Sequence, residues 1–327
     1  MATRIIKTVK PSGGDYTSLA GAIAGEASDF VAGDKIIELD LYAMQDTAQA
    51  VVSGATTDAT RYWDIVAIDI HSGVYDAAKY RLEPTDTDAL VIDDEFVRVY
   101  GLQIDVQGPT GVRAELYLRF IGTPSDVRME RFILAGNGAN SSGIATESGA
   151  FTAKLGNGII YDCSQAFAGG FRFSGSGLCY AEDLTFNNCF YGIRDSHGGS
   201  GTITVKNVIA SAPTDTGFLL DAGSWGAGTD YNASSDGTST AGTHNRVSQT
   251  FTFVNAGAKN FHLAGGDAGA KGFGTDLSAD ANYPITKDID GETPSAPWNI
   301  GADQAAGAGA PPSPVVSRSR RFLGWTA

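Results

Sequence analysis

Apolar positions recur along this chain in two parallel series. In the first series a glycine precedes one apolar residue, at Gly143-Ile144, Gly170-Phe171, Gly192-Ile193 and Gly217-Phe218, with spacings of 27, 22 and 25 residues. In the second series two small or apolar residues are separated by one residue of any type. This pattern occurs at Leu102-x-Ile104, Phe132-x-Leu134, Gly158-x-Ile160, Leu184-x-Phe186 and Val208-x-Ala210, with spacings of 30, 26, 26 and 24 residues. Such a period is typical of a stacked solenoid, because each unit is too short to bury its own apolar face. We expect the following residues to form core stacks: Ile104, Leu134, Ile160, Phe186, Ile144, Phe171, Ile193 and Phe218.

Residues 1–34 predict an N-terminal strand and a cap helix. The stretch Ile5–Val9 alternates as a strand does, and Pro11–Asp15 then turns the chain. Tyr16, Leu19, Ala20 and Ile23 follow with the spacing of one apolar helix stripe. We therefore expect a helix near residues 16–25, with Asp15 or Thr17 at its N-cap. A short helix of this kind covers the open end of a solenoid.

The remaining sequence predicts one all-β domain followed by a tail. We expect residues 35–303 to form a single right-handed parallel β-helix, the handedness following from the general preference of parallel crossovers. Turn residues crowd the breaks between apolar couplets, and glycine alone accounts for 42 residues. Residues 304–327 are rich in Ala, Gly and Pro and predict an extended tail.

Both ends of this region resemble a known superfamily. The stretch Val9–Leu19 (VKPSGGDYTSL), followed by an alanine-rich helix, resembles the N-terminal cap of right-handed parallel β-helix proteins of the pectate-lyase-like superfamily. Phe261-His262-Leu263, Gly274-Thr275-Asp276, Asp288-Ile289-Asp290-Gly291 and Trp298–Asp303 resemble the closing segment of its phage and bacterial members. The resemblance covers most of residues 5–303 and implies the fold. It leaves the activity open, because that superfamily includes lyases, hydrolases, epimerases and non-enzymatic spikes.

The charge of the chain narrows the partners that we expect. It carries 37 acidic and 23 basic residues, a net charge of −14, so we expect neither nucleic acid nor an anionic membrane as a partner. The sequence has no apolar run of the roughly 18 residues that a membrane-spanning helix needs. Met1–Lys10 meets Pro11-Ser12-Gly13-Gly14 where a secretory signal would have its apolar segment, so we expect no such signal.

Three cysteines lie within the repeats. Cys163 and Cys189 are 26 residues apart, one coil of the solenoid, and Cys179 lies between them. The pair is interpreted either as two small core residues on adjacent coils or as a metal or redox pair.

Two arginines occupy the same position of the repeat. Arg172 follows Phe171, and Arg194 follows Ile193, 22 residues later. Alternation predicts that both side chains point outward on adjacent coils, with Asp195 and His197 close by. One interpretation is a carbohydrate-binding ladder, helped by the neighbouring tyrosines Tyr161, Tyr180 and Tyr191. The other is a solvated outer face.

We predict no catalytic residues and no cofactor, with calcium as an open possibility. Of the phrases typical of β-helix hydrolases, only Asp93-Asp94 and a loose Ser196–Gly199 are present, and they lie far apart. Glu182-Asp183 and the Asp288/Asp290 pair are candidate calcium ligands, or else parts of structural turns.

The expected function is that of a phage virion structural protein, a spike, fibre or capsid-decorating β-helix that displays a surface or attaches to glycans. Its expected partners are other virion proteins, copies of itself (a trimer being plausible) and surface polysaccharide. The virion is the expected location, after synthesis in the host cytoplasm. The tail supplies predicted partner-docking residues: Arg318, Arg320, Arg321, Phe322, Leu323 and Trp325. A disordered tail without a partner is the other interpretation.

The alternative function is a polysaccharide lyase or glycoside hydrolase of the phage depolymerase kind. Its substrate would be a cell-surface or uronic-acid polysaccharide. The sequence leaves open whether the protein is an enzyme.

Overall fold

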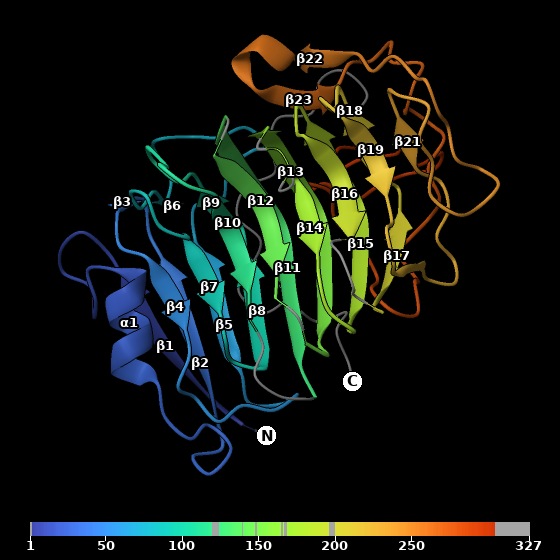
Figure 1. The fold of residues 1–327 in the computed structure, drawn as a ribbon. Helices are drawn as coiled ribbons and strands as arrows, with labels where there is room; N and C mark the ends of the chain where they lie inside the picture. The colour runs from blue at the N-terminus through green and yellow to red at the C-terminus, as the bar shows by residue number, and fades with distance from the viewer. Residues whose placement is uncertain are drawn as a thin grey trace.

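The computed structural model describes residues 2–119, 124–138, 140–147, 149–164, 166, 169–195 and 200–304. In this part of the chain the fold is a parallel β-helix, in which strands stack in order from the N-terminal end to the far end (Figure 1). The expectation of a single all-β solenoid with one short N-terminal helix is confirmed within the described residues. Of the predicted tail, residues 304–327, Gln304 is buried and hydrogen-bonded to Asn299, so it belongs to the fold; the rest lies outside the described residues.

The larger sheet carries the main ladder of parallel strands. In spatial order they are β1 (Thr3–Val9), β2 (Lys35–Leu41), β5 (Trp63–Ala67), β8 (Phe96–Tyr100), β11 (Asp126–Gly138), β13 (Thr152–Cys163), β15 (Leu178–Asn187), β17 (Thr202–Lys206) and β20 (Ser224–Trp225). Short strands beside this path are β3 (Gln45–Asp46), β6 (Arg81–Leu82), β9 (Gln103–Ile104), β18 (Ile209–Ser211) and β21 (Ala233–Ser234). We call this the long sheet.

A seven-stranded parallel sheet forms the other wall of the solenoid. Its strands are β4 (Ala50–Val52), β7 (Leu90–Ile92), β10 (Arg113–Leu118), β12 (Ser141–Thr146), β14 (Phe171–Phe173), β16 (Tyr191–Asp195) and β19 (Thr216–Leu219). The core lies between the two sheets, where the apolar residues of both face each other.

Both apolar series pair in register. The first aligns Ile144, Phe171, Ile193 and Phe218 on successive strands of the seven-stranded sheet. The second aligns Ile104, Leu134, Ile160, Phe186 and Ala210 in the long sheet. All eight predicted core residues are buried, so the expected stacks are confirmed. The glycines of the first series face inward where a side chain has no room: a Cβ on Gly143 would lie 2.5 Å from Ile160.

The N-terminal end is closed by α1 (Leu19–Glu26). Leu19 and Ile23 of the predicted stripe are buried in the core, whereas Ala22 is buried in place of Ala20 and Tyr16 precedes the helix. The expected N-cap is wrong, because Ser18 caps the helix by accepting a hydrogen bond from the Gly21 N–H at 3.0 Å. Asp15 instead accepts hydrogen bonds from the backbone and side chain of Thr8.

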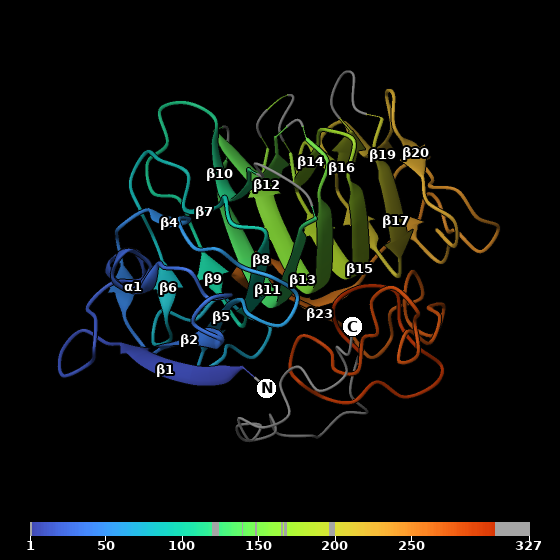
Figure 2. The same ribbon diagram turned by 90° about the horizontal axis from the view of Figure 1, so that it is seen from below.

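The last third of the chain differs from the expected run of coils. The ladder ends at β20 and β21, and residues 250–304, here called the outer segment, run back along the outside of the long sheet. Figure 2 shows this orange-to-red segment on the side of the molecule away from β10, β12, β14 and β16. It includes the β22 (Phe253–Asn255) and β23 (Asn260–Leu263) hairpin, joined by a short 3-10 helix at Ala256–Ala258. Both apolar series stop near residue 218, so no coil has a core-facing couplet after that point.

A column of left-handed residues holds the outer segment in place. Gly101, Arg131, Asn157, Asp183 and Asn207 all have positive φ, and each directly precedes a couplet of the second apolar series. The column places side-chain donors on the outside of the long sheet. Arg131 Nε donates to the Ile289 carbonyl at 2.9 Å, Asn157 Nδ2 to that of Lys287 at 2.6 Å, and Asn207 Nδ2 to that of Thr275 at 2.8 Å.

Apolar contacts complete this cover. Ile289 packs with Ile133 and Ile159 of the long sheet, and Ile300 packs with Ile209. A Cβ on Gly156 would lie 2.6 Å from the ring of Tyr283, so the sheet and the outer segment meet there without a gap. The outer segment therefore belongs to the same folded body as the coils.

The three cysteines are free and buried in the core, as the stacked-core interpretation predicts. No helix among the described residues is both long and apolar enough to cross a membrane.

Candidate functional site

The outer face of the seven-stranded sheet carries a row of side chains in register. Across successive strands the row reads Val91, Tyr117, Ala145, Arg172, Arg194 and Leu219. The predicted adjacency of Arg172 and Arg194 is therefore present, on β14 and β16. Parallel neighbours lie about 4.8 Å apart, so their side chains share one surface.

Arg172 lines a pocket on this face. The pocket has a volume of about 300 Å³, and β10, β12 and β14 supply most of its wall, including Tyr117, Ser142 and Arg172. Asp88, just before β7, forms one side of the pocket. Its Oδ1 accepts a hydrogen bond from the Ala114 N–H at 2.8 Å, which fixes the position of the carboxylate. The small side chain of Ala145 lies between Tyr117 and Arg172 in the row and leaves room for a ligand.

Two polar atoms of the pocket lining lack partners. Ser142 Oγ and Arg172 Nε are inaccessible to solvent, and neither makes a hydrogen bond with a residue that the structure describes. A buried polar group without a partner costs about 1–3 kcal/mol, so a ligand gains from these two atoms where a side-chain rotation brings them to the pocket surface. Burial, and then the charge of Glu147, raise the pKa of Tyr117, which keeps its hydroxyl neutral and able to donate.

Arg194 is held differently from Arg172. Its Nε and Nη2 bind Asp221 Oδ2 at 3.2 and 2.9 Å, and its Nη1 donates to the Tyr191 hydroxyl at 3.0 Å. The guanidinium also lies 4.6 Å from the centre of the Tyr191 ring. The two arginines are neighbours, but only Arg172 faces the pocket with an unpaired donor.

Asp195 is buried at the end of β16, and its carboxylate accepts hydrogen bonds from the backbone N–H groups of Asp221, Ala222 and Gly223. Its acceptors are thus directed at the protein's own backbone. His197 lies outside the described residues. So do all six predicted docking residues of the tail: Arg318, Arg320, Arg321, Phe322, Leu323 and Trp325.

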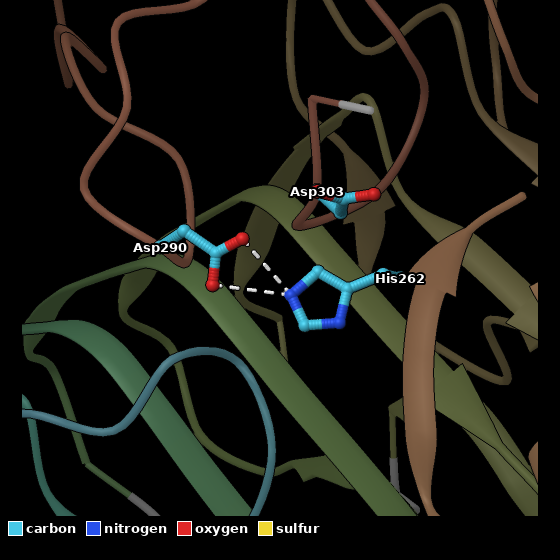
Figure 3. Close-up of side chains that lie close together, drawn as sticks. All are labelled: His262, Asp290 and Asp303. Carbon is cyan, nitrogen blue, oxygen red and sulfur yellow. Dashed lines mark hydrogen bonds and ion pairs between the residues drawn. The ribbon is translucent and has the colours of Figure 1, made fainter. Parts of the chain in front are cut away.

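A second cluster of polar side chains lies within the outer segment (Figure 3). The cluster consists of His262 on β23, Asp290 in the turn that follows Asp288, and Asp303 near the end of the outer segment. Each side chain offers one atom that could bind a metal, and these atoms lie within 4.8 Å of one another. His262 Nε2 lies 3.0 Å from Asp290 Oδ2, and Asp303 accepts a hydrogen bond from the Leu263 N–H at 2.8 Å. The cluster therefore joins three parts of the outer segment.

Burial and mutual charge shift the titration of this cluster. Burial, together with the charge of Asp290, raises the pKa of Asp303 to about 6 and that of Asp288 to about 7. For His262, burial lowers the pKa, but the hydrogen bond and charge of Asp290 outweigh it and the net shift is upward. One imidazole and two carboxylates are ligand types for zinc or manganese. The hydrogen bond between His262 and Asp290 also gives these two side chains a partner without a metal ion.

The two predicted calcium positions differ in their surroundings. Glu182 and Asp183 are buried side by side on β15, and burial raises the pKa of both carboxyls well above the usual range. Asp288 accepts hydrogen bonds from the backbone of Asp290 and Glu292, at 3.0 and 2.8 Å, as in the structural-turn interpretation. Calcium binding stays a prediction.

The pocket residues Tyr117, Ser142 and Asp88 were not predicted, although one signal was present in the sequence. Tyr117 follows Leu116 as Arg172 follows Phe171 and Arg194 follows Ile193. At this coil Glu115 stands where the other couplets have glycine, so the glycine pattern starts the first series one coil too late.

Comparison with known proteins gave no match among family models, curated proteins or solved structures. The parallel β-helix fold implied by the resemblance is present, whereas membership of the pectate-lyase-like superfamily stays a prediction.

Proposed function

We propose that this protein is a structural β-helix of a phage particle, a spike, fibre or capsid-decorating protein, that binds a surface glycan through the seven-stranded sheet. The observation that carries the glycan part is the pocket beside Arg172, with two polar lining atoms that lack partners. The phage part rests on the resemblance of both chain ends to phage and bacterial β-helix proteins.

The pocket chemistry fits a sugar. The Tyr117 ring offers an apolar face with a polar tip, the Arg172 guanidinium offers a fork of donors, and Asp88 and Ser142 offer acceptors. Pockets for small ligands start near about 300 Å³ and combine small apolar walls with a few polar groups. A hydroxyl- or carboxylate-bearing sugar ring suits such a lining, since the guanidinium binds carboxylates through two parallel hydrogen bonds.

The same lining favours binding over hydrolysis. Glycoside hydrolases generally use a pair of carboxyl groups, and Asp88 is the one acid among the described residues of the lining. The alternative, a polysaccharide lyase or hydrolase of the depolymerase kind, rests on the proximity of Arg172, Tyr117 and Asp88, because a lyase needs a base beside groups that hold a uronic acid.

A glycan array tests the proposal. The full-length protein is applied to bacterial capsular and lipopolysaccharide glycans, with Arg172→Ala as the test variant. Arg61→Ala, on the loop before β5 in the other sheet, is the matched control. We expect the wild type and the control to bind the same glycans and Arg172→Ala to lose them. No bound glycan, or equal binding by all three proteins, would overturn the glycan proposal.

The same samples decide between binding and cleavage. Each bound polysaccharide is incubated with the protein, with and without calcium, and new reducing ends and unsaturated sugars are measured. We expect neither product. Either product would establish the enzymatic alternative instead.

Attachment to a particle needs its own test. We propose that residues 305–327 join the protein to other virion proteins through Arg318, Arg320, Arg321, Phe322, Leu323 and Trp325. Deleting these residues should leave glycan binding and the melting temperature unchanged while abolishing incorporation into particles. A truncated protein that still assembles would place the docking surface elsewhere.

A further inference from the structure

A lysine, an aspartate and a glutamate meet beneath the outer segment. Lys206 and Glu182 are paired residues on the neighbouring strands β17 and β15. Asp280 comes from the outer segment, 74 residues after Lys206, and its Oδ2 contacts Lys206 Nζ directly. Glu182 Oε1 lies 3.9 Å from the same nitrogen. The side chains of Lys206, Asp280 and Glu182 are only 12, 10 and 0 % exposed.

Glu182 is the unusual member of this group. It is fully buried, and neither carboxyl oxygen makes a hydrogen bond with a described residue. An ionised carboxylate without a hydrogen-bond partner in such a place is costly, so the buried group is accommodated as the neutral acid. Lying next to the ion pair, this carboxyl group can give up its proton and take one back.

The carboxyl group of Asp280 is held in an orientation that distinguishes its two oxygens. Oδ1 accepts hydrogen bonds from the backbone N–H groups of Asn282 and Tyr283, at 2.8 and 3.1 Å. Oδ2 faces Lys206. Two backbone donors on one oxygen stabilise the negative charge that develops there when a nucleophile adds to the carboxyl carbon.

The surroundings keep water away from the group. Leu277 and Tyr283, on either side of Asp280 in the sequence, are buried in one apolar cluster, with the ring of Tyr180 packed against it. Tyr180 is also two residues from Glu182 on β15. A dry site strengthens every electrostatic contact within it and disfavours hydrolysis of a bond that forms there.

We propose that Lys206 and Asp280 join in an intramolecular amide bond, with Glu182 as the proton carrier. Glu182 gives its proton to Oδ2 of Asp280 and takes one from the Lys206 ammonium, whose Nζ then attacks Cγ of Asp280 while Oδ1 takes the negative charge. The C–Oδ2 bond then breaks. Oδ2 leaves as water with both protons lost by the ammonium, delivered through Glu182, which ends in the state in which it began. One positive and one negative charge disappear, and the step needs no oxidant or reductant.

The bond ties the outer segment to the coils. It links two residues 74 positions apart and so restricts the unfolded chain, as a disulfide does. The inference is independent of what the seven-stranded face binds.

The chain contains its own control. Lys259 Nζ also contacts an aspartate, Asp162 Oδ2, at 2.5 Å, but the Lys259 side chain is 41 % exposed. Water reaches this second pair, and we expect it to stay an ordinary ion pair.

Mass spectrometry of the purified full-length protein tests the proposal. We expect an intact mass lower than the sequence mass by one water, and a branched peptide after digestion that joins Lys206 to Asp280. Lys259 and Asp162 should appear in separate, unmodified peptides. A wild-type protein of full sequence mass, with Lys206 and Asp280 in separate peptides, would overturn the proposal, and this result depends on no variant.

Two variants test the roles of the residues. Lys206→Arg keeps the charge but removes the nucleophile, and Glu182→Gln keeps the volume but removes the proton carrier. Both should be folded by circular dichroism and have the full sequence mass. A Glu182→Gln protein that still loses one water would overturn the role of Glu182.

Discussion

The outward faces of the two sheets differ in whether the outer segment covers them. On the long sheet the outer segment covers the outward groups, and Arg131 donates to the Ile289 carbonyl of that segment as well as to the Tyr100 hydroxyl of β8. On the seven-stranded sheet Arg172 lines an open pocket and its Nε has no described partner. Both arginines lie on the repeats, and the repeat pattern alone does not distinguish them. What distinguishes them is coverage by a non-repeating part of the chain.

This contrast bears on where function is sought on a β-helix. A repeat builds two walls whose outward residues alternate with the core, so both walls carry polar side chains. The covered wall uses its polar groups to hold the chain together. The open wall leaves Arg172 Nε without a described partner.

The largest expected effect comes from the core that both walls share. Phe186 is buried, and a Cβ on Gly170 of the opposite sheet would lie 2.5 Å from its ring. Phe186→Ala should lower the free energy of unfolding by about 3–5 kcal/mol, the usual range for a buried phenylalanine. Denaturant unfolding measures it. Val254→Ala, at a residue 58 % exposed, should change stability by less than about 0.5 kcal/mol. Equal effects of the two changes would contradict the assignment of the core.

A smaller effect should separate the two faces. Gly156→Ala places a Cβ 2.6 Å from Tyr283 and 2.7 Å from Ile285, and should destabilise the cover of the long sheet by about 1–3 kcal/mol. Gly237→Ala meets nothing within 4 Å and is the control. Amide hydrogen exchange should rise in residues 277–302 of the Gly156 variant and stay unchanged in β12 and β14. Faster exchange in β12 and β14 as well would mean that the faces are not independent.

The smallest expected effect is a dependence of the outer segment on pH. The pKa of Asp303 in the folded chain is about 6, and that of Asp288 about 7, both above the ordinary 3.8, and the pKa of His262 is also raised. The folded segment thus binds more protons than the unfolded one, so this stabilisation is complete below about pH 3.8 and is lost as pH rises toward 7 and beyond. His71 is buried against the same region, and its pKa of about 3 in the folded chain lies below the ordinary 6.5. Its contribution therefore has the opposite sign: it is complete above about pH 6.5, is lost as pH falls, and partly offsets the effect of the two aspartates.

Hydrogen exchange between pH 5 and pH 8, corrected for the intrinsic rate, measures this dependence. Protection around Leu263 and Ala302 should fall as pH rises, and the fall should be smaller in Asp290→Asn, which lacks the charged partner of His262. Protection that rises with pH would contradict the assigned shifts.

The sequence predicted the coils well because their contacts recur. The couplets around Ile160 and Phe186 share one spacing, and strand pairing turns a constant spacing into a column. The adjacency of Arg172 and Arg194 followed from the same rule. The positive φ angles of the left-handed column could also have been predicted. Asn157 and Asn207 directly precede couplets of the second series, and asparagine tolerates the left-handed conformation.

The outer segment and the pocket were not predictable in the same way. Arg131 reaches Ile289 across 158 residues, and Asn157 reaches Lys287 across 130, through single contacts with no period. The pocket depends on which wall remains uncovered, so Asp88 and Ser142 become site residues only once the path of the outer segment is known.

The binding affinity of Arg172→Ala for the glycan found on the array tests the central claim most directly. Calorimetric titration of the full-length protein should show a loss of about 10-fold or more, because a hydrogen bond to a charged group contributes about 1.5–3 kcal/mol. Gly156→Ala, which disturbs the covered face alone, should bind as the wild type does. Equal affinities for wild type and Arg172→Ala, or a loss confined to Gly156→Ala, would contradict the account that the open wall is the binding face.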